Sequence, residues 1–243
     1  MSNLANSPEG EAFPYIAQNV GTLLDTLAET AKAAGVPVPR LIPVTKSAAP
    51  DEFLALMRAY PEAAAENRVQ AWKERCELLE TAGLPAPEWH LIGSLQVNKV
   101  KYVVGKVALI QSADSEKLIR EIGRIADARG VRQDILIEIN SGCEPDKGGV
   151  LPEGAESLAE FARTVPGVRL TGLMTMGPAL PDPDAYRPYF SLTRELFDRF
   201  FAAGLFETDS PILSMGMSDS YLAAVREGAT MVRVGRALFR RDN

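Results

Sequence analysis

Short apolar runs alternate with longer stretches of mixed polarity along almost the whole chain. Each run stops at a polar residue or a turn former, which is typical of strands buried in a parallel sheet. We therefore predict eight strands, at residues 41–46, 63–67, 89–93, 107–114, 134–140, 168–176, 212–216 and 230–235. The second run, AAAEN, is rich in alanine and is also compatible with a helix.

The stretches between these runs carry apolar residues at helical spacing. They predict helices near 12–34, at 51–60, 69–83 and 95–105, from 115, around 153–165 and near 183–203. A short helix should follow residue 216, with Ser218 or Asp219 as its N-cap, and a final turn should begin at Arg236. Such an alternation in 243 residues predicts one α/β domain, a (β/α)8 barrel of the TIM type, spanning 1–243 with 1–11 flexible.

Polar residues recur where the predicted strands end. In a parallel barrel these ends meet on one face, where binding sites are built. A single polar residue could serve only as a cap or as part of a solvated loop, but their recurrence on successive strands predicts a pocket. The residues are Lys46, Asn67, His90, Ser112, Asn140, Thr175, Ser214 and Arg233, with Met174 and Gly235 beside them.

Lys46 follows an apolar run, so we expect its amine to lie partly desolvated in the mouth of the barrel. Desolvation favours a neutral amine, which can attack a carbonyl carbon. A lysine that extends from the strand end into solvent is the alternative. Position alone does not separate the two interpretations.

Two loops near the C-terminus have the composition of a phosphate site. SMGMSDS (214–220) follows the seventh strand, and Gly235 follows the eighth. Loops after strands seven and eight commonly bind phosphate in this barrel type, through backbone amides and hydroxyl groups. Opposite a lysine on the first strand, they indicate a phosphorylated carbonyl ligand such as pyridoxal phosphate (PLP).

The composition narrows the chemistry. The formal net charge of −6 argues against a surface that binds nucleic acid. Two cysteines and one histidine are too few for the usual zinc or disulfide frameworks, so we expect no bound metal and a cytoplasmic location. No apolar run is long enough to span a membrane. The cluster of Lys99, Lys101 and Lys106 could bind a phosphate-rich partner, but a solvated helix face is the favoured interpretation.

Six segments resemble the pyridoxal phosphate homeostasis protein family (YggS/PROSC-type), which is related to the barrel domain of alanine racemase. They are VTK (44–46), ENRVQ (66–70), WHLIGSLQVNKVK (89–101), GLMTMGP (172–178), SMGMSDSYLAAVREGA (214–229) and VRVGRALF (232–239). The resemblance covers nearly the whole chain after the first dozen residues. It implies that Lys46 carries PLP as a Schiff base and that Arg233 faces the pyridine nitrogen.

The same resemblance implies roles for the other site residues. Ser214, Gly235 and the backbone of Arg236 would bind the phosphate, with Ser218 close by. Asn67, His90, Asn140 and Met174 would line the ring and the aldehyde side. The chain departs from the family pattern at Ala65, Arg68 and Ala71, which puts lid contacts or a partner surface near the second strand in doubt.

Three classes of function remain open at this point. The first is a PLP carrier for cofactor homeostasis, with no catalytic residues and with apo PLP enzymes as clients. The second is an enzyme, either a PLP-dependent racemase or lyase or a class I aldolase. The third is a binding module that regulates a partner. Racemases of this lineage carry a second domain that supplies a tyrosine base, and we expect this chain to lack it, so the carrier is favoured. We also expect a monomer.

Overall fold

The computed structural model describes residues 13–241; the flexibility expected for 1–11 concerns residues outside this range. Eight parallel strands follow one another around the sheet in chain order, and β8 returns to pair with β1. They are β1 (Arg40–Pro43), β2 (Ala63–Glu66), β3 (Glu88–Leu91), β4 (Leu109–Ala113), β5 (Gln133–Ile139), β6 (Val168–Thr175), β7 (Ile212–Ser214) and β8 (Met231–Val234). A bridge between Val44 and Ala65 joins β1 to β2. The predicted (β/α)8 barrel is confirmed, and the alanine-rich second run is a strand.

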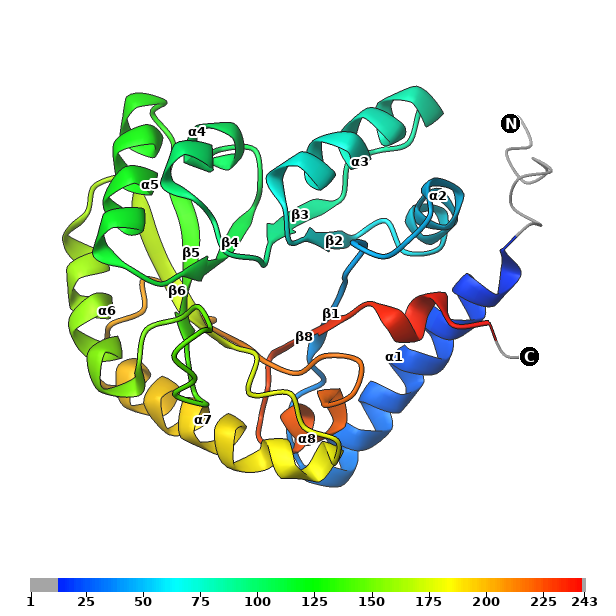
Figure 1. Cartoon of the computed structure of the whole chain (residues 1–243). Coiled ribbons are helices and arrows are strands. Elements are labelled where there is room, and N and C mark those ends of the chain that lie inside the picture. The colour runs from blue at the N-terminus through cyan, green and yellow to red at the C-terminus, as the bar shows by residue number, and fades with distance from the viewer. Residues whose placement is uncertain (1–12, 242–243) are drawn as a thin grey trace.

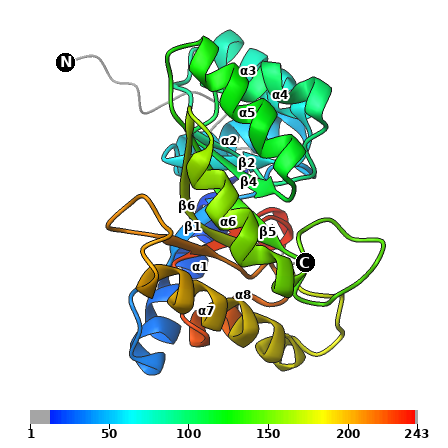
Figure 2. The same cartoon turned by 90° about the vertical axis from the view of Figure 1, so that its left-hand side faces the viewer.

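Helices surround this cylinder (Figure 1). They are α1 (Pro14–Ala34), α2 (Pro50–Ala59), α3 (Val69–Ala82), α4 (Val100–Val103), α5 (Glu116–Ala128), α6 (Ala155–Thr164), α7 (Arg187–Ala202) and α8 (Tyr221–Arg226). Short 3-10 turns are η2 (Val97–Lys99), η3 (Pro152–Gly154), η4 (Pro183–Tyr186) and η5 (Arg236–Phe239). The loop after β5 projects from one end of the barrel, as a turned view shows (Figure 2).

Two local predictions were wrong. The helix expected over 95–105 is only η2 followed by α4, which ends at Val103 because the backbone of Val104 is not helical, with ψ of 129°. The N-cap of α8 is Ser220 and neither of the residues expected. The hydroxyl of Ser218 lies instead near backbone amides of the loop after β8, and Asp219 pairs with Arg236.

The core has two parts. The larger part lies between the sheet and the helices, and it includes Phe53, Leu27 and Phe200, all fully buried. The smaller part fills the barrel interior and contains residues such as Ile42, Leu136, Ala63 and Ala65, whereas Ala64 of β2 packs in the larger part. A strand covered on both faces can consist of small apolar residues, which explains why the helical propensity of alanine does not decide the structure of residues 63–66.

The junction of β1 and β2 is held by side chains as well as by backbone. Thr45 donates its hydroxyl to the buried carboxylate of Glu66, with an oxygen–oxygen distance of 2.6 Å. Arg75 of α3 donates to the carbonyls of Thr45 and Ala48 at 3.0 and 2.6 Å. Its Nε lies 3.5 Å from the same Glu66 carboxylate. The polar contacts therefore fix the end of β1 just before Lys46.

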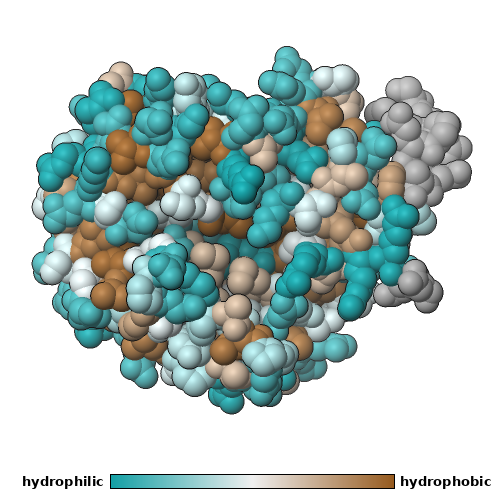
Figure 3. Space-filling view, viewed as in Figure 1, coloured by the Kyte–Doolittle hydropathy of each residue, from teal (hydrophilic) through white to brown (hydrophobic). Residues whose placement is uncertain are grey.

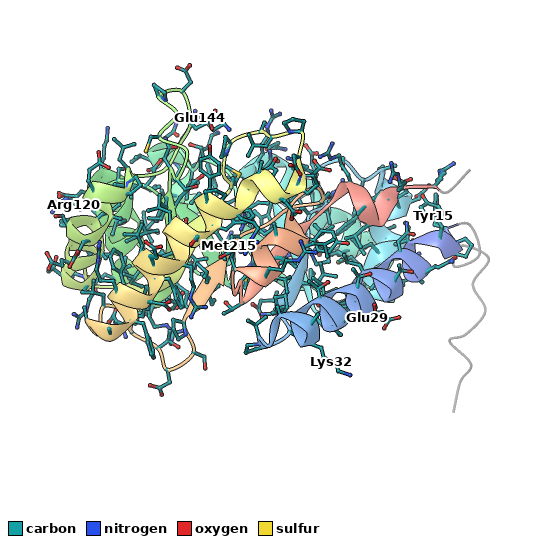
Figure 4. All side chains as sticks on the ribbon, turned by 90° about the horizontal axis from the view of Figure 1, so that it is seen from below. Tyr15, Glu29, Lys32, Arg120, Glu144 and Met215 are labelled. Carbon is teal, nitrogen blue, oxygen red and sulfur yellow. The ribbon has the colours of Figure 1, made fainter. Side chains whose placement is uncertain are left out.

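Figure 4 shows the two ends of the barrel, with Glu144 in the loop after β5 at one end and Lys32 in the last turn of α1 at the other. Within residues 13–241, no helix combines the length and apolar character needed to cross a membrane. The described side chains also form no group of three or more histidine, cysteine or carboxylate residues suited to a metal ion.

Candidate functional site

A cavity of about 550 Å³ opens at the carboxyl ends of the strands. This volume lies within the range of small-molecule and cofactor sites. Figure 3 shows this face of the molecule, where hydrophilic residues lie among apolar ones. Six of the residues singled out in the sequence line the cavity together: Lys46, Asn67, Ser218, Arg233, Gly235 and Arg236.

Lys46 lies three residues after the end of β1 and two residues beyond the Val44 bridge. Its side chain is exposed, so the expected partial desolvation of the amine was wrong. The chain turns into α2 at this point, which leaves the side chain at the rim of the cavity instead of inside the barrel. The amine is thus open to a ligand that enters from solvent.

The loops after β7 and β8 form a cradle of hydrogen-bond donors. The backbone amides of Gly235 and Ala237 both point to the hydroxyl oxygen of Ser218, each at a long 3.4 Å. Bonds of this length are weak, so the amides remain able to donate to a better acceptor. A Cβ at Gly235 would lie 2.9 Å from the carbonyl oxygen of Val44, so only glycine lets the two strands approach this closely. Two amides and a hydroxyl are the donor set that phosphate groups favour.

Arg233 lies at the floor of the cavity, fully buried. It donates to the hydroxyl of Ser214 at 2.7 Å and to the carbonyl of Thr175 at 2.8 Å. Burial lowers the pKa of Arg233 to about 10, and the nearby carboxyl of Glu138 opposes this shift. The guanidinium therefore stays charged at neutral pH. Burial also raises the pKa of Glu138 to about 7, with a contribution from Asp114.

A chain of hydrogen bonds continues from Arg233 through the barrel interior. Ser214 donates to the side-chain carbonyl of Gln111 at 2.7 Å. The Gln111 amide lies 2.8 Å from Nδ1 of His90, whose Nε2 lies 2.9 Å from the Glu88 carboxylate. The Gln111 amide can only donate and the Glu88 carboxylate can only accept, so Nδ1 of His90 accepts and Nε2 donates. His90 is therefore assigned as neutral, with its proton on Nε2. Burial lowers the pKa of His90, although Glu88 opposes it.

Four of the predicted residues do not line the cavity: His90, Asn140, Met174 and Ser214. His90 lies opposite Leu109, the first residue of β4, so it stands low in the barrel and not at the end of its strand as expected. The strand continues past it to Leu91, and Ile92 and Gly93 line the cavity on that side. Ser214 is buried one layer below the cavity and contacts Arg233.

Asn140 and Met174 contact other parts of the protein and not the cavity. The Asn140 amide donates to the carbonyl of Glu144 at 2.8 Å, and its side-chain oxygen accepts from the Glu144 amide at 3.1 Å. It thereby closes the loop that follows β5. Met174 is fully buried inside the barrel, and Met176, two residues further along the same strand face, lines the cavity.

Sequence reasoning missed several residues of the site. Ile92 and Met176 lie two positions after predicted residues, so the two-residue period of a strand could have found them. Tyr186 also lines the cavity, but it comes from η4, and no local pattern in the sequence points to it. Gln111 lies inside a predicted strand, and a polar side chain within that apolar run could have indicated a buried hydrogen bond.

Comparisons with known proteins identify the family and the fold. The alanine racemase N-terminal domain model matches residues 19–241. A pyridoxal phosphate homeostasis protein from Aquifex aeolicus is 42% identical over 200 residues, which is 82% of this chain and 86% of the relative. The structure of PipY from Synechococcus elongatus is 28% identical. It matches with a TM-score of 0.81 without PLP and 0.77 with PLP bound, over 93% of this chain and 100% of PipY. The chain belongs to the pyridoxal phosphate homeostasis protein family, within the wider group of alanine racemase N-terminal domains.

Proposed function

We propose that this chain binds PLP in the cavity, as a Schiff base on Lys46, and serves intracellular cofactor homeostasis without a dedicated catalytic reaction. The observation that carries the proposal is the convergence of three elements on one cavity. These are the accessible amine of Lys46, the donor cradle around Ser218 and the charged Arg233. When bound, PLP supplies an electrophilic aldehyde and a ring that withdraws electrons.

The residues fit the cofactor in both charge and shape. The amides of Gly235 and Ala237 would hold the phosphate together with the Ser218 hydroxyl and the backbone of Arg236, since the two amides make only long bonds within the chain. Asn67 would lie on the ring side of the cavity. The other predicted site residues would act indirectly, by holding Arg233, the loop after β5 and the barrel floor in place. They are Ser214, His90, Asn140 and Met174.

Arg233 would limit the chemistry that bound PLP could support. A cation beside the pyridine nitrogen disfavours protonation of that nitrogen. An unprotonated ring is a poorer electron sink than a pyridinium, so carbanion chemistry would be suppressed. Tyr186 is the tyrosine in the cavity wall, and its hydroxyl is already engaged with the amide and carbonyl of Leu180 at 3.0 and 3.4 Å. It is therefore poorly placed to act as a base.

The proposed role extends to partners. Relatives of this chain are named pyridoxal phosphate homeostasis proteins, and the PipY structure was solved with PLP bound. We propose that residues 1–243 act as one PLP-binding domain, monomeric and cytoplasmic, with apo PLP enzymes as clients. The exposure of Lys46 supports this role, because a carrier has to load and unload its cargo through an open mouth.

The test is the visible absorbance of the purified protein, before and after borohydride reduction, followed by peptide mass mapping. The proposal expects a yellow protein whose reduced phosphopyridoxyl group maps to the peptide with Lys46. Lys46→Ala should abolish the adduct, whereas Lys32→Ala, at the opposite end of the barrel, should leave it unchanged. A protein that takes up no added PLP would overturn the proposal.

A further inference from the structure

Two sequence features that the cofactor site does not use meet in a second cavity. One is Arg68, a departure from the family pattern, and the other is the lysine-rich segment 98–106. The second cavity has a volume of about 560 Å³ and lies between α3 and the η2–α4 segment. Asn67 lines both this cavity and the cofactor cavity, so the two are neighbours.

The walls of the second cavity are basic. Arg68, Lys73 and Lys99 line it, and none of its lining residues is acidic. Lys101 adds a fourth cation beside the ring of Tyr102. Among the residues that the structure describes, none of these four forms an ion pair, although most ion pairs of the chain involve arginines elsewhere on the surface.

The cations crowd around one aromatic ring. Nζ of Lys73 lies 3.9 Å from the centroid of the Tyr102 ring, and Nζ of Lys101 and Lys99 lie 5.2 and 5.8 Å from it. No two of these charges are more than about 11 Å apart, which is comparable with the Debye length of roughly 8–10 Å. The ring face attracts cations but carries no net charge, so the repulsion between the ammonium groups persists. A bound anion would offset the repulsion between these ammonium groups.

The chemistry of the walls defines the ligand. Several cations in one concave site favour a ligand with more than one negative charge, and a phosphate monoester carries about −1.5 to −2 at neutral pH. Gln70, Gln96 and Ser94 add neutral donors. The volume suits a small molecule, and the net charge of −6 disfavours an extended nucleic acid. We propose that the second cavity binds a small phosphorylated molecule beside the cofactor site.

The experiment is calorimetric titration of the protein with phenyl phosphate at low salt. We expect saturable binding that Lys99→Glu weakens about tenfold, because it removes one charge-assisted contact and adds a repulsive charge. Lys32→Glu is the matched control: it is also an exposed lysine and changes the net charge equally, but it lies at the far end of the barrel. It should change the affinity less than twofold. Equal weakening by both variants, or no saturable binding, would overturn the proposal.

A second variant separates the two cavities. Gly235→Val should fill the phosphate cradle of the cofactor site and leave phenyl phosphate binding intact. Loss of binding in this variant would place the ligand in the cofactor cavity and sink the proposal. Tighter binding of oligothymidylate than of phenyl phosphate would also contradict a small-molecule site. PLP uptake, measured by visible absorbance, is independent of these outcomes, so the proposed function stands or fails separately.

Discussion

At the end of the barrel where the strands begin, charged side chains pair with one another. At the other end Arg236 pairs with Asp219 and Lys147 with Glu144, but Lys46, Lys73 and Lys99 form no ion pair among the described residues. Arg40 forms two hydrogen bonds to Glu88, at 2.8 and 2.9 Å, and Arg169 forms two to Asp134, both at 2.6 Å. At the open end, by contrast, Lys46 makes no ion pair with any residue of 13–241. We infer that the ion pairs at the end where the strands begin stabilise the fold, whereas the lysines without partners at the open end are available to ligands.

The two ends also shift glutamate pKa values in opposite directions. Hydrogen bonding from His90 and from Arg40 lowers the pKa of Glu88 to about 2, despite its partial burial. Burial and the neighbouring Asp114 raise the pKa of Glu138 to about 7, although Arg233 opposes them. A carboxylate with partners stabilises the fold, whereas one held near a binding site without a direct partner destabilises it.

The largest effect on stability is expected for Gln111→Leu, which cuts the hydrogen-bond chain between the two ends. It leaves Nδ1 of His90 and the O–H donor of Ser214 unpaired in a buried site, although the Ser214 oxygen still accepts from Arg233, at a cost of about 2–4 kcal/mol. Urea unfolding measures the loss. Arg169→Met breaks an ion pair at the paired rim for comparison and should cost about 0.5–1 kcal/mol. Equal losses of stability in the two variants would show that the buried hydrogen bonds of Gln111 contribute no more than an ion pair at the surface.

Glu138→Gln should stabilise the protein at alkaline pH. The native pKa is above the ordinary value of 4.5, so the native state binds more protons than the unfolded state between pH 4.5 and about 7. Wild-type stability therefore falls as pH rises through this window, and glutamine removes the penalty. We expect a gain on the order of 1–3 kcal/mol at pH 8 and little difference at pH 4.5. A variant that is less stable than wild type at pH 8 would mean that the Arg233 contact outweighs burial.

Gly235→Ala tests the cradle with a single methyl group. The added Cβ would lie 2.9 Å from the Val44 carbonyl oxygen and 3.3 Å from the Val44 Cβ, so the loop has to move. PLP affinity, measured by absorbance titration, should fall about tenfold, or roughly 1.4 kcal/mol. Gly21→Ala is the control, because a Cβ there meets nothing within 4 Å. It should leave the affinity unchanged and stabilise α1 slightly.

Glu88→Gln should have the smallest effect. The side chain is 40% exposed, so loss of its charge should cost only about 0.5–1 kcal/mol at pH 7. Because the native pKa lies below the unfolded value, this contribution is present above pH 4.5 and is lost as the pH falls toward about 2. Thermal melts at pH 7 and pH 3 measure the difference between variant and wild type, which should shrink at the lower pH.

The sequence predicted the strands well because parallel strands covered on both faces are apolar runs with clear ends. It placed Lys46, Asn67 and Arg233 in one cavity for the same reason, since strand ends converge. It misplaced His90, because an apolar run does not show how far up the barrel each strand starts. Tyr186 was missed because it reaches the cavity from a helix start, through tertiary packing that leaves no local pattern.

The closure of the cylinder at the Val44–Ala65 bridge has a dynamic consequence. The β5–β6 pair is aligned over seven residue pairs, but β1 and β2 share this one bridge and the side-chain contacts of Thr45 and Arg75. This junction should therefore open more readily than the β5–β6 pair, as should the β7–β8 pair with its single register match. Deuterium should enter at the amide of Thr45 before it enters the centre of β5. Slow opening of the cylinder at this junction would thus begin one residue from Lys46, the residue to which we propose that PLP binds and from which it is released.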